Sequence, residues 1–177
     1  MVQRKLWTSF LCLLCGCTVW ASIPDDHPAR KPQTDSRIYL IHTDVLYKNS
    51  DDPRAEVLVG NVKLSHEGVF LDCDSARLYR EDNSFDAFGH VVMVQGDTLK
   101  LTCDSLFYDG FGMRAMARSN VRLHHNKSRL ETENLDYDRV YGVGLYPEGG
   151  TLYDGNNVLG SDWGQYTTGT HEAFFTN

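Results

Sequence analysis

The sequence has 177 residues, which is enough for a single domain with a buried core. Charged residues make up 23% and hydrophobic residues 41% of the chain, a balance that excludes a disordered acidic tail and a multi-span membrane protein. The formal net charge of −7 argues against nucleic-acid binding, because proteins that bind nucleic acids are usually basic. Abundant glycine and 11% aromatic residues, without a long helical period, favour β structure.

Residues 1–21 have the pattern of a secretory signal peptide. Arg4 and Lys5 precede an uncharged run that ends at Ala21, where a small residue favours cleavage. The run is shorter than the roughly 20 residues that span a bilayer, although a membrane anchor remains an alternative. Lipidation at Cys17, within a sequence similar to a bacterial lipobox, is a second alternative and would attach the chain to the outer membrane. Each alternative exports the remainder, so we expect a periplasmic protein.

Residues 22–37 are expected to form a flexible leader. They contain three of the five prolines and no apolar periodicity. The folded domain is therefore expected to cover residues 38–177.

An internal repeat of about 30 residues follows. One half-repeat places a small residue two positions before a branched or apolar residue, and its copies start 29, 30 and 30 residues apart, at Gly60, Gly89, Ser119 and Gly149. The other half-repeat runs from a leucine to a tyrosine, as in Leu71–Tyr79, Leu101–Tyr108, Leu130–Tyr137 and Leu159–Tyr166. Ile41–Tyr47 is a degenerate half copy at the front.

Each half-repeat alternates apolar and polar residues and therefore predicts a half-buried strand. In the second half-repeat the alternation changes phase at Asp104–Ser105 and at Glu133–Asn134, which predicts a bulge or a corner there. Short turns rich in glycine and aspartate favour hairpins over a parallel β-helix. The predicted fold is all-β, a rolled antiparallel β-jelly-roll built from two-strand repeats.

The alternation also predicts which side chains face inward. These positions are Val62, Leu64, Leu71, Val91, Met93, Leu101, Val121, Leu123, Leu130 and Leu159. The pattern alone is compatible with a closed, dry core and with an open groove for a ligand.

Three segments together resemble the OstA-like N-terminal domain, the LptA-type module of lipopolysaccharide transport in the variety found in Bacteroidetes. They are Leu71–Ala76, Phe85–Val91 and Gln95–Leu99. The resemblance implies an open β-jelly-roll "boat" whose apolar inside binds the lipid A acyl chains of lipopolysaccharide. It makes the ten inward positions the lining of a lipid groove, and it implies a non-enzymatic role in transport to the outer membrane and in outer membrane assembly. Longer relatives contain more repeats, so a complete bridge component and a part of a longer protein both remain open.

No catalytic residue, cofactor or metal site is predicted. Asp72 and Asp74 share a face, but an acid recurs there in every repeat, which is typical of an architectural role. Cys73 and Cys103 occupy equivalent places two strands apart, about 9–10 Å, which is too far for a disulfide. We therefore expect free, inward-facing thiols. A structural cell-envelope repeat protein without a ligand and, further behind, a carbohydrate-active enzyme on the same scaffold are the alternative functions.

Residues 110–130 contain five basic residues and no acid, and they could meet lipid A phosphates. The alternation places Arg114, Arg118 and Arg122 outward, which favours a solvated outer face. His124 and His125 are neighbours on a strand and should point to opposite faces.

The predicted sheet has two unguarded edges, Ile38–Ile41 and the stretch from Val158 to Phe175, which contains neither proline nor lysine. Together with the resemblance, this predicts head-to-tail edge-strand pairing, with a second copy or with another LptA/OstA-type module.

Overall fold

The structure is a computed structural model that describes residues 36–48, 50–170 and 172–176. All of these belong to one unit of the chain, residues 33–177. The predicted signal peptide, Cys17 and most of the predicted leader lie outside the described residues. Within them every regular element is a strand, and no helix is long and apolar enough to cross a membrane.

Thirteen strands form one sheet in which each pairing is antiparallel and the two ends of the strand path, β1 and β13, do not pair. The predicted fold class, an all-β rolled antiparallel sheet that stays open, is confirmed. The strands are β1 (Tyr39–His42), β2 (Val45–Lys48), β3 (Ala55–His66), β4 (Val69–Tyr79), β5 (Ser84–Gln95), β6 (Leu99–Asp109), β7 (Arg114–His125), β8 (Ser128–Asp138), β9 (Val143–Tyr146), β10 (Gly150–Asp154), β11 (Asn157–Ser161), β12 (Trp163–Thr167) and β13 (Glu172–Thr176).

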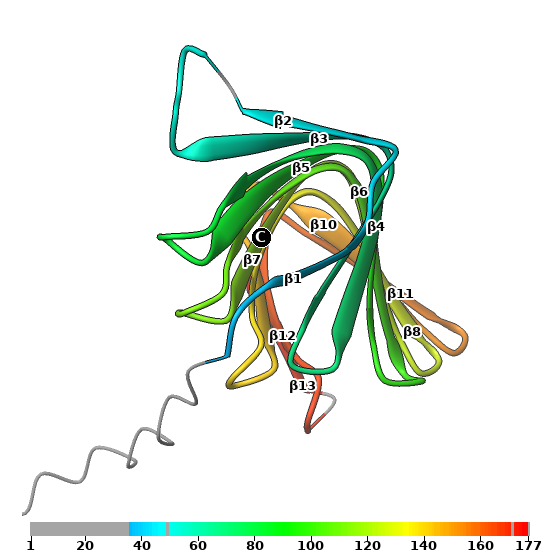
Figure 1. Cartoon of the computed structure of the whole chain (residues 1–177). Coiled ribbons are helices and arrows are strands. Elements are labelled where there is room, and N and C mark those ends of the chain that lie inside the picture. The colour runs from blue at the N-terminus through cyan, green and yellow to red at the C-terminus, as the bar shows by residue number, and fades with distance from the viewer. Residues whose placement is uncertain (1–35, 49, 171, 177) are drawn as a thin grey trace, which may run out of the picture. The chain divides into compact units, whose positions relative to one another are not determined.

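The long strands β3 to β8 bend in the middle (Figure 1), and the short strands come in pairs that together match one bent strand. Thus β1 and β2 both pair with β3, while β9 and β10 both pair with β8. The bend divides the sheet into two halves that face each other. We call them the leucine wall (residues 39–42, 62–66, 69–73, 91–95, 99–103, 121–125, 128–132, 150–154 and 157–161) and the alanine wall (residues 45–48, 55–59, 75–79, 84–88, 105–109, 114–118, 134–138, 143–146, 163–167 and 172–176).

The corner between the walls is built from a recurring bulge. Between β4 and β5 the register passes from Asp72–Val92 to Ser75–Phe88, and between β7 and β8 it shifts between Arg118 and Val121. The second shift lies opposite Glu133, as the change of phase predicted. Residues with positive φ supply the extra length on β3, β5 and β7, in the pairs Gly60–Asn61, Gly89–His90 and Ser119–Asn120.

The acid that recurs once per repeat occupies this corner. The Oδ2 atom of Asp74 lies 2.7 Å from Nδ1 of His90, and a Cβ atom added to Gly89 would lie 2.4 Å from the same oxygen. One repeat later, Asn120 donates from Nδ2 to Oδ2 of Asp104 at 2.6 Å. Opposite these two acids the neighbouring strand therefore places a small residue, Gly89 or Ser119, followed by a side chain that hydrogen-bonds to the carboxylate, His90 or Asn120. This explains the repeated acids as architecture.

Candidate functional site: the interior between the two walls

The inner face of the leucine wall presents one continuous row of large apolar side chains. Cross-strand pairing places them opposite one another on nine successive strands. The row consists of Leu40, Leu64, Leu71, Met93, Leu101, Leu123, Leu130, Leu152 and Leu159. Nearer the corner, a second row contains the smaller residues Val62, Cys73, Val91, Cys103 and Val121, all of which are buried.

The alanine wall alternates large and small side chains instead. Leu106 is flanked by Ala87 and Ala117 on the neighbouring strands. In the next row Tyr108 lies between Phe85 and Ala115, and the rings of Phe85 and Tyr108 stack with centroids 5.1 Å apart. These residues are buried together with those of the leucine wall in one core cluster.

All ten side chains predicted to face inward fall on the leucine wall. Nine of them are at most 3% exposed, and the exception is Leu159, which is 39% exposed. Leu159 lies opposite Leu152 and so keeps its place in the row. It is exposed because β11 is the edge strand of this wall. No inward position was assigned on the alanine wall, although the change of phase at Asp104–Ser105 and at Glu133–Asn134 predicted that the strands turn a corner there.

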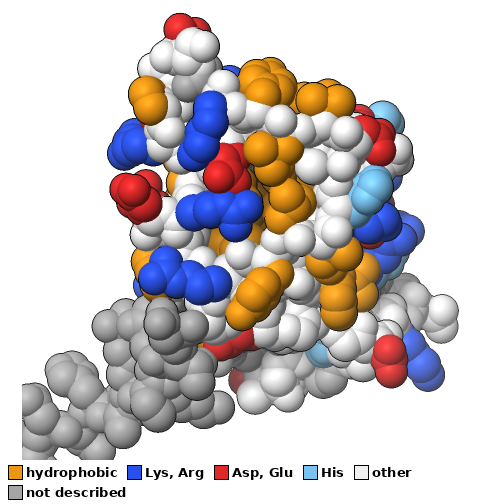
Figure 2. All heavy atoms as spheres, in the orientation of Figure 1, with side chains coloured by type: hydrophobic (Ala, Val, Ile, Leu, Met, Phe, Trp, Pro, Cys, Tyr) orange, Lys and Arg blue, Asp and Glu red, His pale blue; other side chains and the backbone are white. Residues whose placement is uncertain are grey.

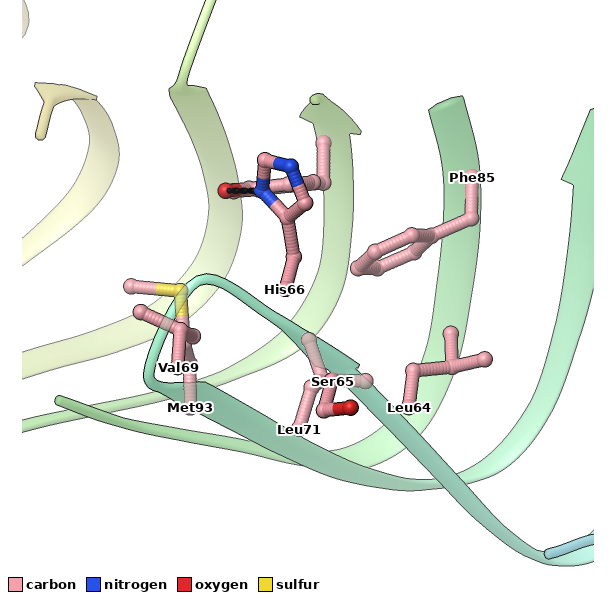
Figure 3. Close-up of a pocket in the computed structure, with 8 residues that line it drawn as sticks. Leu64, Ser65, His66, Val69, Leu71, Phe85 and Met93 are labelled. Atoms are coloured by element: carbon pink, nitrogen blue, oxygen red, sulfur yellow. Dashed lines mark hydrogen bonds between the residues drawn. The ribbon is translucent and has the colours of Figure 1, made fainter. Parts of the chain in front are cut away.

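The two walls pack against each other and leave little space between them. A pocket of about 10 Å³ holds roughly one water-sized sphere and is lined by residues of both walls, including Leu64, Met93, Phe85 and Tyr108 (Figure 3). Sites for small molecules measure roughly 300–1,000 Å³. The walls must therefore separate before a ligand of that size can occupy this interior.

A polar latch joins the walls on the side opposite the corner. Nδ1 of His66, on the leucine wall, lies 2.8 Å from the Tyr108 hydroxyl on the alanine wall, the bond drawn dashed in Figure 3. Arg139, in the turn between β8 and β9, donates to the Tyr108 hydroxyl, to the Glu67 carbonyl at 3.2 Å and to Oε1 of Gln95 at 3.4 Å. We call His66, Tyr108 and Arg139 the latch.

The latch fixes the protonation of His66. Because Arg139 donates to the Tyr108 oxygen, the tyrosine hydrogen is free to be donated to Nδ1, and this requires a neutral imidazole. Burial lowers the pKa of His66, and the positive charge of Arg139 lowers it further, against smaller opposing effects of Glu67 and the Ser36 carbonyl. Burial likewise raises the pKa of Tyr108.

Two further contacts close the same side. The Ile38 amide donates to Oδ1 of Asn83 at 2.9 Å, and Nδ2 of Asn83 donates to the Ser36 carbonyl at 3.1 Å. This ties the segment before β1 to the turn between β4 and β5. Farther along, Nδ1 of His125 lies 3.2 Å from the hydroxyl of Tyr166, again joining the leucine wall to the alanine wall.

The two thiols face the interior. Cys73 lies opposite Val62, Cys103 lies opposite Val91, and both are free and buried. Burial raises the pKa of Cys73 to about 11 and that of Cys103 to about 12. They therefore stay protonated and act as small apolar residues of the corner row.

The inner rows continue to both edges of the sheet without a cover. At one end Leu46 of β2, opposite Leu58, is 46% exposed. At the other end Phe175 of β13, opposite Gly164, is 46% exposed. Figure 2 shows several groups of hydrophobic side chains on the face that carries β1. Both ends of the interior are therefore apolar surfaces that a neighbouring module could cover.

The arginines of the predicted basic strip lie on the outer face, where each pairs with a carboxylate. Arg118 contacts Asp136 at 2.8 Å, and Arg122 contacts Glu131 at 3.4 Å across β7 and β8. His124 is exposed and His125 is buried, so the two rings lie on opposite faces. In the part of the chain that the structure describes, no three His, Cys, Asp or Glu side chains are grouped to hold a metal ion.

The geometry defines a class: a bent, open antiparallel sheet with an apolar interior between two walls. A family model described as OstA-like protein matches residues 35–177, and the chain belongs to this family. The earlier resemblance is thereby confirmed.

A solved structure shares the fold. It is LptH from Pseudomonas aeruginosa, described as the LptA homologous periplasmic component of the conserved lipopolysaccharide transport device. The match has a TM-score of 0.56 and 16% sequence identity, and it covers 60% of this chain and 80% of LptH. A search of curated protein sequences finds no match.

Proposed function

We propose that this protein is a periplasmic, non-enzymatic module that binds lipopolysaccharide through its lipid A acyl chains and helps carry it to the outer membrane. The observation that carries the proposal is the apolar interior, whose inner rows extend from Leu40 to Leu159 and end uncovered at both edges. Membership of the OstA-like family and the fold shared with LptH support it. The signal-like residues 1–21 support export.

The edges support assembly with further modules of the same kind. β1 and β2 form one end of the sheet, β11 and β13 form the other, and each carries exposed apolar side chains such as Ile41, Leu46, Val158 and Phe174. Unpaired edge strands extend a sheet by β-augmentation. The two ends differ in sequence, so the contact is heterologous and runs head to tail. The partner is a second copy or another LptA/OstA-type module.

Photo-crosslinking in lipopolysaccharide-producing cells tests the ligand. A photoreactive residue at Leu101 on the leucine wall, and another at Leu106 on the alanine wall, should each form adducts with lipopolysaccharide. The matched control is Lys63, on the outer face of the same sheet, which should form none. Absence of adducts at both inner positions, in a protein that is exported and folded, would favour a structural envelope protein whose interior stays dry.

Sedimentation of the purified protein tests the assembly. Leu159→Lys and Phe175→Lys each place a charge at the uncovered end of an inner row and should shift concentration-dependent oligomers to monomer. Phe70→Lys is the control, because Phe70 is exposed on the outer face of β4, away from both edges. A wild-type protein that is monomeric at every concentration, alone and mixed with related modules, would leave a carrier without a bridge.

A further inference from the structure

Arg139 differs from the arginines of the outer face in the kind of partners it has. Arg114, Arg118 and Arg122 each pair with a carboxylate of β8. Within the described residues Arg139 takes part in no ion pair, and the hydrogen-bond partners of its side chain are neutral: the Tyr108 hydroxyl, the Glu67 carbonyl, the Gln95 amide oxygen and, at 3.5 Å, Nδ1 of His66. A guanidinium forms shorter and stronger bonds with phosphate or carboxylate than with neutral acceptors. An anion would therefore bind Arg139 more strongly than its present neutral partners do, and could replace them.

The surroundings of Arg139 suit an amphiphile rather than a free anion. The apolar pocket between the walls, lined by Leu64, Met93 and Phe85, also borders His66 and Tyr108, the two latch residues that Arg139 contacts. Beside it the turn between β8 and β9 exposes Val140 and Tyr141, at 54% and 65%. Oδ1 of Asp138 accepts hydrogen bonds from both of their amides, at 2.9 and 3.2 Å, and holds this apolar turn in place.

At the latch, a small number of polar groups join the two walls. His66 is 3% exposed, and among the described residues its Nε2 atom has no hydrogen bond with good geometry, although the Ser36 carbonyl is near enough to affect its pKa. The Tyr108 hydroxyl joins His66 to Arg139. If Arg139 turned towards an anion outside, the latch would lose its central donor, and the walls would remain joined here by one neutral hydrogen bond.

We propose that Arg139 binds the phosphate-bearing headgroup of an acylated ligand, and that this exchange of partners opens the latch so that the acyl chains enter between the walls. The inference rests on the proposed function, because it assumes that the interior receives lipid. It adds the position at which the ligand enters and the residue that recognises its headgroup. It also explains why the headgroup binds before the acyl chains enter. Headgroup binding comes first, because it removes one of the polar contacts that hold the two walls together.

Binding of phosphorylated lipid A, of the same lipid A without phosphates and of inorganic phosphate tests the proposal. Arg139→Gln should weaken binding of phosphorylated lipid A by about tenfold or more, since a charge-assisted contact is lost. It should not weaken binding of the dephosphorylated lipid, because that lipid has no phosphate to lose and the latch is weaker in this variant. Arg122→Gln is the control, because Arg122 is an exposed arginine of the outer face. Arg139→Lys should recover part of the loss, since it restores the charge without the planar fork.

Tyr108→Phe supplies an independent measurement. It keeps the ring against Phe85 but removes the hydroxyl that Arg139 and His66 share, so lipid should bind several-fold faster in stopped-flow mixing. Equal weakening of both lipids by Arg139→Gln, or no weakening of either, would overturn the proposal, as would unchanged association with Tyr108→Phe. Tight binding of inorganic phosphate alone would show that Arg139 forms a site for a free anion, and would overturn the claim that its ligand is an amphiphile. If the wild-type protein binds neither lipid, the proposed function fails first; if it binds both and the variants do not discriminate, only the latch fails.

Discussion

The two walls enclose the same interior but are packed on different principles. The leucine wall repeats one kind of side chain on strand after strand, so that each position resembles the next. On the alanine wall a large residue fits beside a small one, as Tyr108 does beside Ala115 and Tyr146 does over Gly164, where an added Cβ atom would lie 1.9 Å from the tyrosine oxygen. A wall of similar residues tolerates substitution by a residue of different shape and similar volume, whereas a wall of fitted large and small residues does not. The alanine wall should therefore set the stability of a single arrangement, while the leucine wall supplies apolar area.

The largest effect should come from a charge on the leucine wall. Leu101→Asp places a carboxylate without a partner among fully buried apolar groups and should cost several kcal/mol, enough to unfold the module. Lys63→Gln, on the outer face, removes only an exposed ion pair with Asp72 and should cost about 1 kcal/mol or less. Urea unfolding followed by circular dichroism measures both. Similar midpoints for the two variants would show that the inward and outward assignment is wrong.

A smaller effect should separate the walls from each other. Ala117→Leu overfills the alanine wall and should cost roughly 1–3 kcal/mol, whereas Leu123→Met, a change of shape at nearly constant volume on the leucine wall, should cost less than about 1.5 kcal/mol. Both positions are at most 1% exposed, so burial does not confound the comparison. Thermal unfolding of the two variants in the same buffer ranks them. The reverse order would mean that the leucine wall holds the more specific packing.

The smallest effect concerns the contact that joins the walls. The pKa of His66 in the folded protein lies below 6.5, so the unfolded chain binds the proton first as the pH falls. Stability should decline as the pH drops through 6.5 and level off below the folded pKa. The groups that face His66 are Arg139, Glu67 and Tyr108. His66→Gln should remove this component, which the difference between the two stability–pH curves isolates. Parallel curves would show that the latch does not depend on a neutral imidazole. His90, whose pKa the Asp74 carboxylate raises, should keep its opposite contribution in both proteins.

The extent of sequence prediction follows the same division. A uniform row such as Leu64, Leu71 and Leu101 produces an alternation with a period of two that can be recognised in the sequence. The change of phase at Asp104–Ser105 located the corner. The alanine wall was missed because alanine and glycine at its inner positions do not stand out as hydrophobic. Arg139 was missed for another reason: it lies in a turn without periodicity, and its latch partners are 31 to 73 residues away in the chain. No local pattern reports such contacts.

The division into walls also gives the module a direction. On the leucine wall, antiparallel pairings connect β1 to β11 in eight steps, through β3, β4, β5, β6, β7, β8 and β10, so β1 and β11 run the same way. On the alanine wall nine steps connect β2 to β13, through β3 to β9 and β12, so β2 and β13 run opposite ways. Two modules stacked in the same orientation would meet in a parallel pair on one wall and an antiparallel pair on the other. Parallel and antiparallel ladders space their hydrogen bonds differently. A joint that contains one ladder of each kind therefore distinguishes the two orientations of a module. In a chain of such joints, every module would have the same orientation along the chain.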